Sequence, residues 1–227
     1  MNYLTEVFDF FLPRFCFSCK RKLLSTEEVV CPECLSKIKL ADSERLTQEF
    51  NRKFLNKKII SGFVSLYVFE KDKELQHIIH SLKYNQRFLV GKFLGKKLGD
   101  SIKSILNEWS IDIIVPVPLH HLKKAERGYN QSFYIAKGIS ETAKLPINNR
   151  IIKRKKFTQS QTTMNLIERQ DNINGAFKIK NGEKLSGKNV LLIDDVITTG
   201  ATTSECGKVL LDRGVNKIYA ASVAIAD

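Results

Sequence analysis

Val190-Leu-Leu-Ile-Asp-Asp-Val-Ile-Thr-Thr-Gly-Ala-Thr-Thr203 is the stretch that decides the fold expected for this chain. It begins with a short apolar run, residues 190–193, typical of a strand that is buried on both faces. Two acids, Asp194 and Asp195, follow at the point where such a strand would leave the core. A hydroxyl-rich segment with one glycine then leads into a helical pattern that reaches Leu211.

These features together predict a site for a sugar phosphate. A tight loop at a helix N-terminus binds anions, because backbone N–H groups and the helix dipole point at the ligand and threonine hydroxyls add donors. The two acids would repel a phosphate, but they suit sugar hydroxyls or a metal ion. We therefore interpret the stretch as a ribose 5-phosphate site. An ordinary strand–turn–helix with a polar cap is the structural alternative.

The stretch resembles the signature of type I phosphoribosyltransferases, which bind 5-phosphoribosyl 1-pyrophosphate (PRPP). In that family the acidic pair holds the 2′- and 3′-hydroxyls of the ribose, and the loop binds the 5-phosphate. The resemblance assigns Asp194 and Asp195 to the ribose, and it implies an α/β fold with a Rossmann-like parallel sheet flanked by helices. The residues that it assigns to the phosphate are Thr198, Thr199, Gly200, Ala201, Thr202 and Thr203.

The composition is that of a globular protein with an excess of positive charge. The 227 residues are enough for one α/β core and a small appendage. The net charge of +13 favours polyanionic partners such as nucleic acid, membrane lipid or a highly phosphorylated ligand, whereas solvated surface lysines are the alternative. One basic block supplies the candidates for nucleic-acid binding: Arg150, Lys153, Arg154, Lys155 and Lys156.

The N-terminal residues are apolar, but they do not form a signal peptide pattern. Glu6 and Asp9 lie inside the run, and no basic leader or small-residue cleavage site accompanies it. No stretch approaches the ~18 apolar residues of a membrane span. We therefore expect a cytoplasmic protein without a membrane span. An amphipathic docking helix is expected from the apolar residues that share one helical face: Leu4, Val7, Phe8, Phe11 and Leu12.

Four cysteines near the N-terminus have the spacing of a metal site. They form two C-x-x-C pairs with eleven residues between the pairs, which suits two turns that share one tetrahedral ion. Zinc is the expected ion, and iron would accept the same ligands. Two disulfides suit an oxidising compartment better, and a thioredoxin-like redox pair would not need a second copy. The predicted ligands of a structural Zn²⁺ are Cys16, Cys19, Cys31 and Cys34.

We divide the chain into a zinc module (residues 1–40), a helical connector (41–58) and a phosphoribosyltransferase-type domain (59–227). In the domain, a buried strand at 111–119 precedes a basic loop that contains Lys123, Lys124 and Arg127. Ligands of parallel sheets collect at the carboxyl ends of the strands, so this loop and the 194–203 loop should share one rim. That arrangement suits a sugar with phosphate at one end and pyrophosphate at the other, although a solvated loop is the alternative.

The remaining pattern supplies further helices and strands. Strands are expected at 63–69, 147–152 and 177–179, and one at 218–225 should close the sheet. Helices are expected at 75–83, at 88–109 and after residue 131. Close helix packing is expected from glycines at a four-residue step, Gly91, Gly95 and Gly99. The polar residues 158–174 are a candidate for a mobile loop that closes over PRPP, and a permanently ordered surface loop is the alternative.

The chain is identified as a member of the ComF family of phosphoribosyltransferase-like proteins, because the resemblance covers nearly its whole length. A departure from the family pattern is Gln86, where we expect glycine. The motifs that carry the resemblance are the four-cysteine module, Ile79-His80-Ser-Leu82-Lys83-Tyr84, Val115-Pro-Val-Pro118 and Arg127-Gly-Tyr-Asn-Gln131.

The resemblance implies roles for the residues on the rim. As catalytic residues, Asp194 and Asp195 would orient the ribose, and Arg127 would receive the pyrophosphate together with Lys123 or Lys124. Lys83 is a weaker candidate for the pyrophosphate. Mg²⁺, bound largely through PRPP oxygens, would carry part of the leaving-group charge.

Three functions remain open at this point. The first is transfer of phosphoribosyl to an unidentified acceptor, as in nucleoside metabolism. The second is non-enzymatic binding of single-stranded DNA, because ComF relatives are linked to DNA uptake in natural competence. Competence helicase-type proteins would then be partners. Only one ring, Phe157, lies in the basic block, so the sequence offers few aromatic residues on which bases could stack. A PRPP-sensing regulator is a third interpretation, without a helix-turn-helix pattern to support it.

Overall fold

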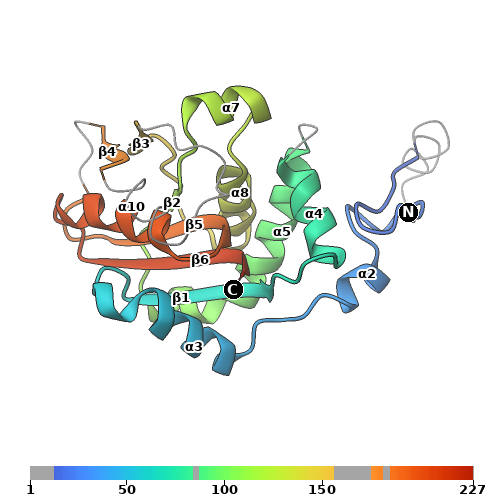
Figure 1. The fold of residues 1–227 in the computed structure, drawn as a ribbon, viewed down its shortest axis with the longest axis horizontal. Coiled ribbons are helices and arrows are strands. Elements are labelled where there is room, and N and C mark those ends of the chain that lie inside the picture. Colours follow the sequence, from blue (N-terminus) through green and yellow to red (C-terminus); the bar gives the residue numbers. More distant parts are fainter. Residues whose placement is uncertain (1–12, 84–86, 156–174, 181–184, 227) are drawn as a thin grey trace.

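The computed structural model describes residues 13–83, 87–155, 175–180 and 185–226, and its centre is a four-stranded parallel sheet (Figure 1). The strands are β1 (Gly62–Val68), β2 (Ile113–Pro116), β5 (Asn189–Ile197) and β6 (Lys217–Ile225). Their order is β1-β6-β5-β2, and each neighbouring pair is parallel. We expected the last strand to close the sheet, but this expectation was wrong. β6 lies inside the sheet because β1, from the start of the domain, pairs along its outer side.

Helices cover both faces of this sheet, as predicted. On one face, α5 (Phe88–Ser101) contacts β1 and β6, and α8 (Gln131–Ala143) contacts β2 and β5. On the other face, α3 (Ser43–Lys53) contacts β1, and α10 (Ala201–Leu211) contacts β5 and β6. The remaining helices are α2 (Pro32–Ser36), α4 (Glu74–Lys83), α6 (Lys103–Glu108), α7 (His121–Arg127) and the short 3-10 helix η1 (Leu55–Lys57).

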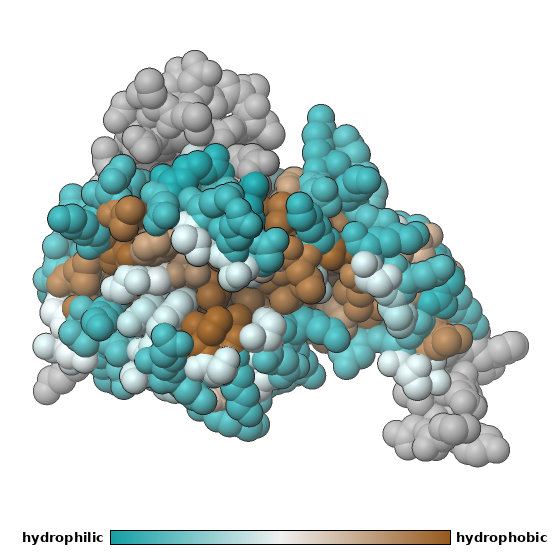
Figure 2. All heavy atoms as spheres, turned by 90° about the horizontal axis from the view of Figure 1, so that it is seen from below, coloured by the Kyte–Doolittle hydropathy of each residue, from teal (hydrophilic) through white to brown (hydrophobic). Residues whose placement is uncertain are grey.

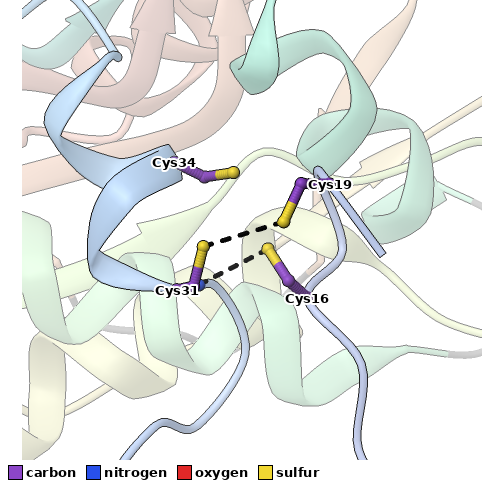
Figure 3. A group of neighbouring side chains, drawn as sticks. All are labelled: Cys16, Cys19, Cys31 and Cys34. Atoms are coloured by element: carbon purple, nitrogen blue, oxygen red, sulfur yellow. Dashed lines mark hydrogen bonds between the residues drawn. The ribbon is translucent and has the colours of Figure 1, made fainter. Parts of the chain in front are cut away.

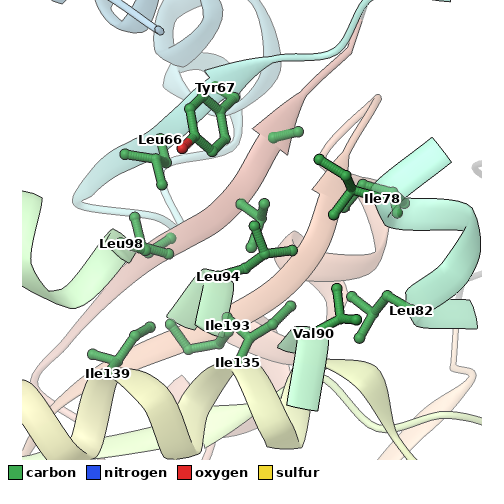
Figure 4. Close-up of a cluster of buried hydrophobic side chains, with 14 of the residues drawn as sticks. Leu66, Tyr67, Ile78, Leu82, Val90, Leu94, Leu98, Ile135, Ile139 and Ile193 are labelled. Atoms are coloured by element: carbon green, nitrogen blue, oxygen red, sulfur yellow. The ribbon is translucent and has the colours of Figure 1, made fainter. Parts of the chain in front are cut away.

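The first half of β5 is buried on both faces. Leu191 and Ile193 pack with residues of α5 and α8, in the cluster drawn in Figure 4. Val190 and Leu192 point to the opposite face and pack with residues of α10. The prediction from the apolar run is therefore confirmed. The strand does not leave the core at the acids, however, because pairing with β6 continues through Asp194 to Ile197.

The glycines of α5 allow it to lie directly against α8. A side-chain carbon added at Gly95 would lie 2.1 Å from the carbonyl oxygen of Ile135, and one added at Gly99 would lie 2.1 Å from the Thr142 hydroxyl. The predicted close packing is confirmed. The expected helix over 88–109 is divided at Ile102 into α5 and α6.

Two expectations around the basic segments were wrong. The segment after β2 is the helix α7, which His120 begins by accepting a hydrogen bond from the N–H of Leu122 and which ends at Gly128 with φ 78°. The strand expected at 147–152 is displaced, because β3 spans Ile152–Arg154 and pairs antiparallel with β4 (Phe177–Ile179) in a separate small sheet. Only Ile147 forms a bridge to β2, at Ile114.

Several predictions fall on residues outside the described ranges. They are the docking helix within residues 1–12, the segment around Gln86, Lys156, Phe157 and the loop 158–174. The division into module, connector and domain also stays a prediction. The described N-terminal segment and α2 lie at one end of the molecule, beside α4 and α5 (Figure 1). The face in Figure 2 is largely hydrophilic, with apolar patches between the polar side chains.

In the parts of the chain that the structure describes, none of the helices combines the length and the apolar character needed to cross a bilayer.

Candidate functional site

A cavity of about 340 Å³ lies at the carboxyl ends of β2 and β5, and we call it the acid-pair cavity. The two loops that we expected on one rim do meet there. The cavity also reaches the end of α4, the start of α8 and the end of β3. The predicted site residues that line it are Lys83, Lys123, Arg127, Asp194, Asp195, Thr198 and Thr202.

The acid pair is held by three hydrogen bonds of ordinary length. Asp194 Oδ1 accepts from the Ser132 hydroxyl at 3.1 Å and from the N–H of Asp195 at 2.9 Å. Asp195 Oδ1 accepts from the N–H of Val196 at 2.8 Å. Burial, followed by the neighbouring charge of Asp195, raises the pKa of Asp194 to about 8. At neutral pH Asp194 is therefore mostly protonated and can donate a hydrogen bond to a ligand oxygen.

Lys83 forms an ion pair with the acid pair. Its Nζ lies 3.6 Å from Asp195 Oδ2, and both side chains are only partly exposed. The last residue of α4 thus extends towards the carboxyl end of β5. We expected Lys83 near a pyrophosphate, and in the structure it pairs with Asp195.

The threonine-rich loop has the backbone shape that its glycine allows. Gly200 has φ 68° and caps α10, and a side-chain carbon there would lie 2.6 Å from the Phe54 ring. The Thr199 hydroxyl accepts from the N–H of Ala201 at 3.3 Å. A second, small cavity is lined by Asp194, Val196, Ile197 and all six residues predicted to bind a phosphate: Thr198, Thr199, Gly200, Ala201, Thr202 and Thr203.

The opposite wall of the acid-pair cavity is basic. Lys123 and Arg127 lie one turn apart on α7 and line the cavity. Burial, followed by the charges of Arg154 and Arg127, lowers the pKa of Lys123. An anion between these groups would relieve their repulsion. Lys124 does not line this cavity, so the structure separates it from the other predicted pyrophosphate ligands.

Sequence reasoning missed two cavity residues and placed a third elsewhere. Ser132 binds Asp194, and Gln131, which is 1% exposed, accepts from Arg127 Nη1 at 3.2 Å. Among the described residues, Gln131 Nε2 has no hydrogen-bond partner, so a ligand oxygen could accept from it. Asn130, which caps α8 through the N–H of Ser132, is the local signal that brings this helix start to the rim. Arg154, predicted only for nucleic acid, also lines the acid-pair cavity.

A further hollow of about 750 Å³ lies beside the acid-pair cavity, and we call it the basic–aromatic groove. The phenylalanine and tyrosine rings that line this groove belong to α8 and to the residue that precedes Asn130. The basic and aromatic residues that line it are His121, Lys124, Tyr129, Phe133, Tyr134, Arg150, Lys153, Arg154 and Lys180. No Asp or Glu of the described residues lines it. Lys155, predicted with this group, is exposed but does not line the groove.

The four cysteines form one cluster, as Figure 3 shows. All four sulfurs lie within 4.8 Å of one another, and the Sγ atoms of Cys19 and Cys31 are 3.8 Å apart. Tetrahedral zinc with Zn–S bonds of ~2.3 Å requires sulfurs about 3.8 Å apart. Burial raises the pKa of Cys16, but backbone N–H groups, that of Cys31 first, outweigh burial and lower it to about 7. The cluster therefore fits a structural zinc ion held by these four thiolates.

Comparison with known proteins agrees with this architecture. Residues 129–226 match the family model described as phosphoribosyl transferase domain. Competence protein F of Haemophilus influenzae is 31% identical over 156 residues, which cover 67% of this chain and 68% of that protein. The DNA utilization protein YhgH of Escherichia coli is 27% identical over 62% of each chain. Competence protein ComFC of Bacillus subtilis is 21% identical over 88% of this chain and 78% of that protein.

The sheet order, the helices on both faces and the matched domain agree with the fold expected from residues 190–203. The 31% identity to competence protein F covers about two thirds of each protein, and the four cysteines predicted as metal ligands form one cluster. The chain belongs to the ComF family of competence proteins and has the type I phosphoribosyltransferase fold with a metal-binding cysteine module.

Proposed function

We propose that the protein binds PRPP in the acid-pair cavity and that it acts in DNA uptake during natural competence. One observation carries the proposal for the ligand. The acid-pair cavity brings together two adjacent carboxyl groups, two cations of α7, and Thr198 and Thr202 of the threonine loop, whose small cavity also reaches Asp194. PRPP has a diol, a phosphate and a pyrophosphate, so each of its polar groups would meet a complementary wall.

Different residues would bind the ribose, the 5-phosphate and the pyrophosphate. Protonated Asp194 would donate to one ribose hydroxyl, while Asp195, the partner of Lys83, would accept from the other. The backbone N–H groups and hydroxyls of residues 198–203 would bind the 5-phosphate. Lys123 and Arg127 would bind the pyrophosphate. Gln131 Nε2, which has no hydrogen-bond partner among the described residues, would donate to the same group.

The same arrangement suits transfer of phosphoribosyl to an acceptor. When bound with PRPP, Mg²⁺ would neutralise part of the pyrophosphate charge. The acid pair would orient the ribose. The cations of α7 would stabilise the negative charge that develops on the departing pyrophosphate. No acceptor follows from the described side chains, so a pyrophosphate-release assay with a panel of nucleobases and amines is the way to identify one.

Calorimetry tests the ligand. Mg²⁺ and PRPP should bind the wild-type protein at one site per chain, and Asp194→Asn/Asp195→Asn should abolish binding. Lys123→Gln should weaken binding about 10-fold or more, because a charge-assisted contact is lost. Lys124→Gln is the matched control, since this neighbouring lysine lines the groove and not the cavity. Equal losses from the two lysine variants, or full affinity in the double Asp variant, would contradict the proposal.

We propose single-stranded DNA as the second ligand, at the basic–aromatic groove. The groove combines cations that contact phosphates with rings on which bases stack, and no acidic side chain of the described residues lines it. Competence helicase-type proteins would be partners in this role. A cytoplasmic location belongs to the same proposal, because thiols there stay reduced and can bind zinc.

Salt dependence tests the second ligand. The affinity for a fluorescent oligothymidylate should fall with salt at a log–log slope of about −0.7 per contacted phosphate. Arg150→Gln/Lys153→Gln should make this slope shallower. An affinity that does not respond to salt, or that is unchanged in the double variant, would exclude the groove as the site.

A further inference from the structure

The acid-pair cavity and the basic–aromatic groove are separated by a thin common wall. Pro118, Leu119 and Arg154 line both hollows. The first two follow the end of β2, and Arg154 is the last residue of β3. A charged side chain in such a wall is within reach of a ligand in either hollow.

Arg154 is the cation of this wall, and its position is determined by the small sheet. Its guanidinium carbon lies 5.4 Å from the centre of the Phe177 ring on β4. Burial lowers the pKa of Arg154, while nearby groups that include Asp194 oppose that effect. The guanidinium side chain borders the acid-pair cavity on one side and the groove on the other.

The remaining cations are not shared. Lys123 and Arg127 line only the acid-pair cavity, and Lys153 and Lys180 line only the groove. A phosphorylated sugar in the cavity and a nucleic-acid backbone in the groove would each have cations of their own. Both ligands are anionic, however, and one guanidinium lies between them.

We infer that PRPP and single-stranded DNA bind this protein antagonistically, with Arg154 as the residue that couples the two sites. The inference rests on the proposed function, since it takes PRPP as the cavity ligand and DNA as the groove ligand. The anion that binds first takes the contact with the Arg154 guanidinium, which the second anion then lacks. Free PRPP would thus promote release of a bound strand.

The experiment measures each affinity with and without the other ligand. Binding of a fluorescent oligothymidylate is followed by anisotropy at constant Mg²⁺ and ionic strength, with PRPP absent or saturating. We expect PRPP to weaken the binding by about 5- to 150-fold, the usual range of coupling between sites. Calorimetry of PRPP must then give the same factor when the oligonucleotide is saturating, because coupling is reciprocal. Inorganic phosphate at matched ionic strength controls for screening.

Substitutions at two neighbouring residues of β3 distinguish coupling between the sites from a general effect of positive charge on DNA binding. Arg154→Gln should bring the coupling factor close to one. Lys153→Gln removes an exposed groove cation, so it should lower the affinity for DNA and leave the coupling factor at its wild-type value. Equal coupling in both variants would overturn the role of Arg154. The reciprocity measured on the wild-type protein tests the antagonism even where Arg154→Gln does not fold.

The outcomes distinguish the inference from the proposed function. Binding of both ligands with no mutual effect, or tighter DNA binding with PRPP, would overturn the antagonism alone. Absence of PRPP binding in calorimetry would overturn the proposed function and this inference with it. Loss of DNA affinity with PRPP that persists in Asp194→Asn/Asp195→Asn would also overturn it, because PRPP would then act outside the cavity.

Discussion

Replacing Asp194 by Asn should stabilise the protein without ligand, and it should do so in a pH-dependent way. Asp194 is placed where its charge is unfavourable, between the buried end of β5 and the neighbouring Asp195. Asn has the same shape, and its Oδ1 can still accept from the Ser132 hydroxyl and the N–H of Asp195. The substitution therefore removes the charge that burial disfavours and keeps the hydrogen bonds.

The magnitude follows from the two protonation states. The pKa of this carboxyl is 3.8 in an unperturbed aspartate and about 8 in the folded protein. Between these pH values the folded chain holds a proton that the unfolded chain releases, so wild-type stability falls as pH rises. The free energy of unfolding falls by about 1.4 kcal/mol per pH unit. The loss reaches about 4 kcal/mol at pH 7 and levels off above pH 8. This is an upper bound, because Asp194 is not fully shielded from water.

Thermal and urea unfolding at a series of pH values from 5 to 9 is the assay. Asp194→Asn should melt above the wild type at pH 8, by up to about 10–20 °C, and the difference should shrink towards pH 5. Asp212→Asn, at the exposed end of α10, controls for the removal of one surface carboxylate. A difference that does not change with pH, or a destabilised Asp194→Asn at pH 8, would refute the reasoning.

Three further substitutions test other parts of the structure. Cys31→Ser, or chelation of the wild type, should release one zinc per chain and lower the melting temperature, whereas a metal-free wild type that melts normally would exclude the ion. Gly95→Ala should destabilise the protein by about 1–3 kcal/mol in urea, because the added carbon would meet the Ile135 carbonyl at 2.1 Å; a neutral effect would contradict the close contact of α5 and α8. Gly200→Ala should cost a similar ~1–3 kcal/mol and weaken PRPP binding, since φ is 68° and the Phe54 ring lies 2.6 Å from the added carbon; unchanged binding would show that the loop shape is not required.

The sequence predicted those parts of the fold that depend on local pattern. The apolar run at 190–193 and the following threonines determine a strand, a loop and a helix within one continuous segment, and the helix ends at Leu211 as expected. The close packing of α5 was likewise predictable, because glycines at a four-residue step lie on one face of a helix. The acid-pair cavity was predicted because parallel strands bring their carboxyl ends to one rim.

Other features depend on contacts between distant segments, which local pattern does not contain. β6 lies inside the sheet because of its pairing with β1, far away in the sequence. The sequence offered little support for base stacking beside the basic block, because Phe157 is the one aromatic residue near that block. The structure supplies Phe133 and Tyr134 from α8 instead. Arg154 reaches the cavity through the antiparallel pairing of β3 with β4, whose register no local signal predicts.

The structure of crystals grown with Mg²⁺ and PRPP tests the central claim most directly. We predict that the 5-phosphate lies in the loop of residues 198–203, that the ribose hydroxyls contact Asp194 and Asp195, and that the pyrophosphate faces Lys123. A ligand whose phosphate lies outside that loop, or an empty cavity at saturating PRPP, would contradict the account.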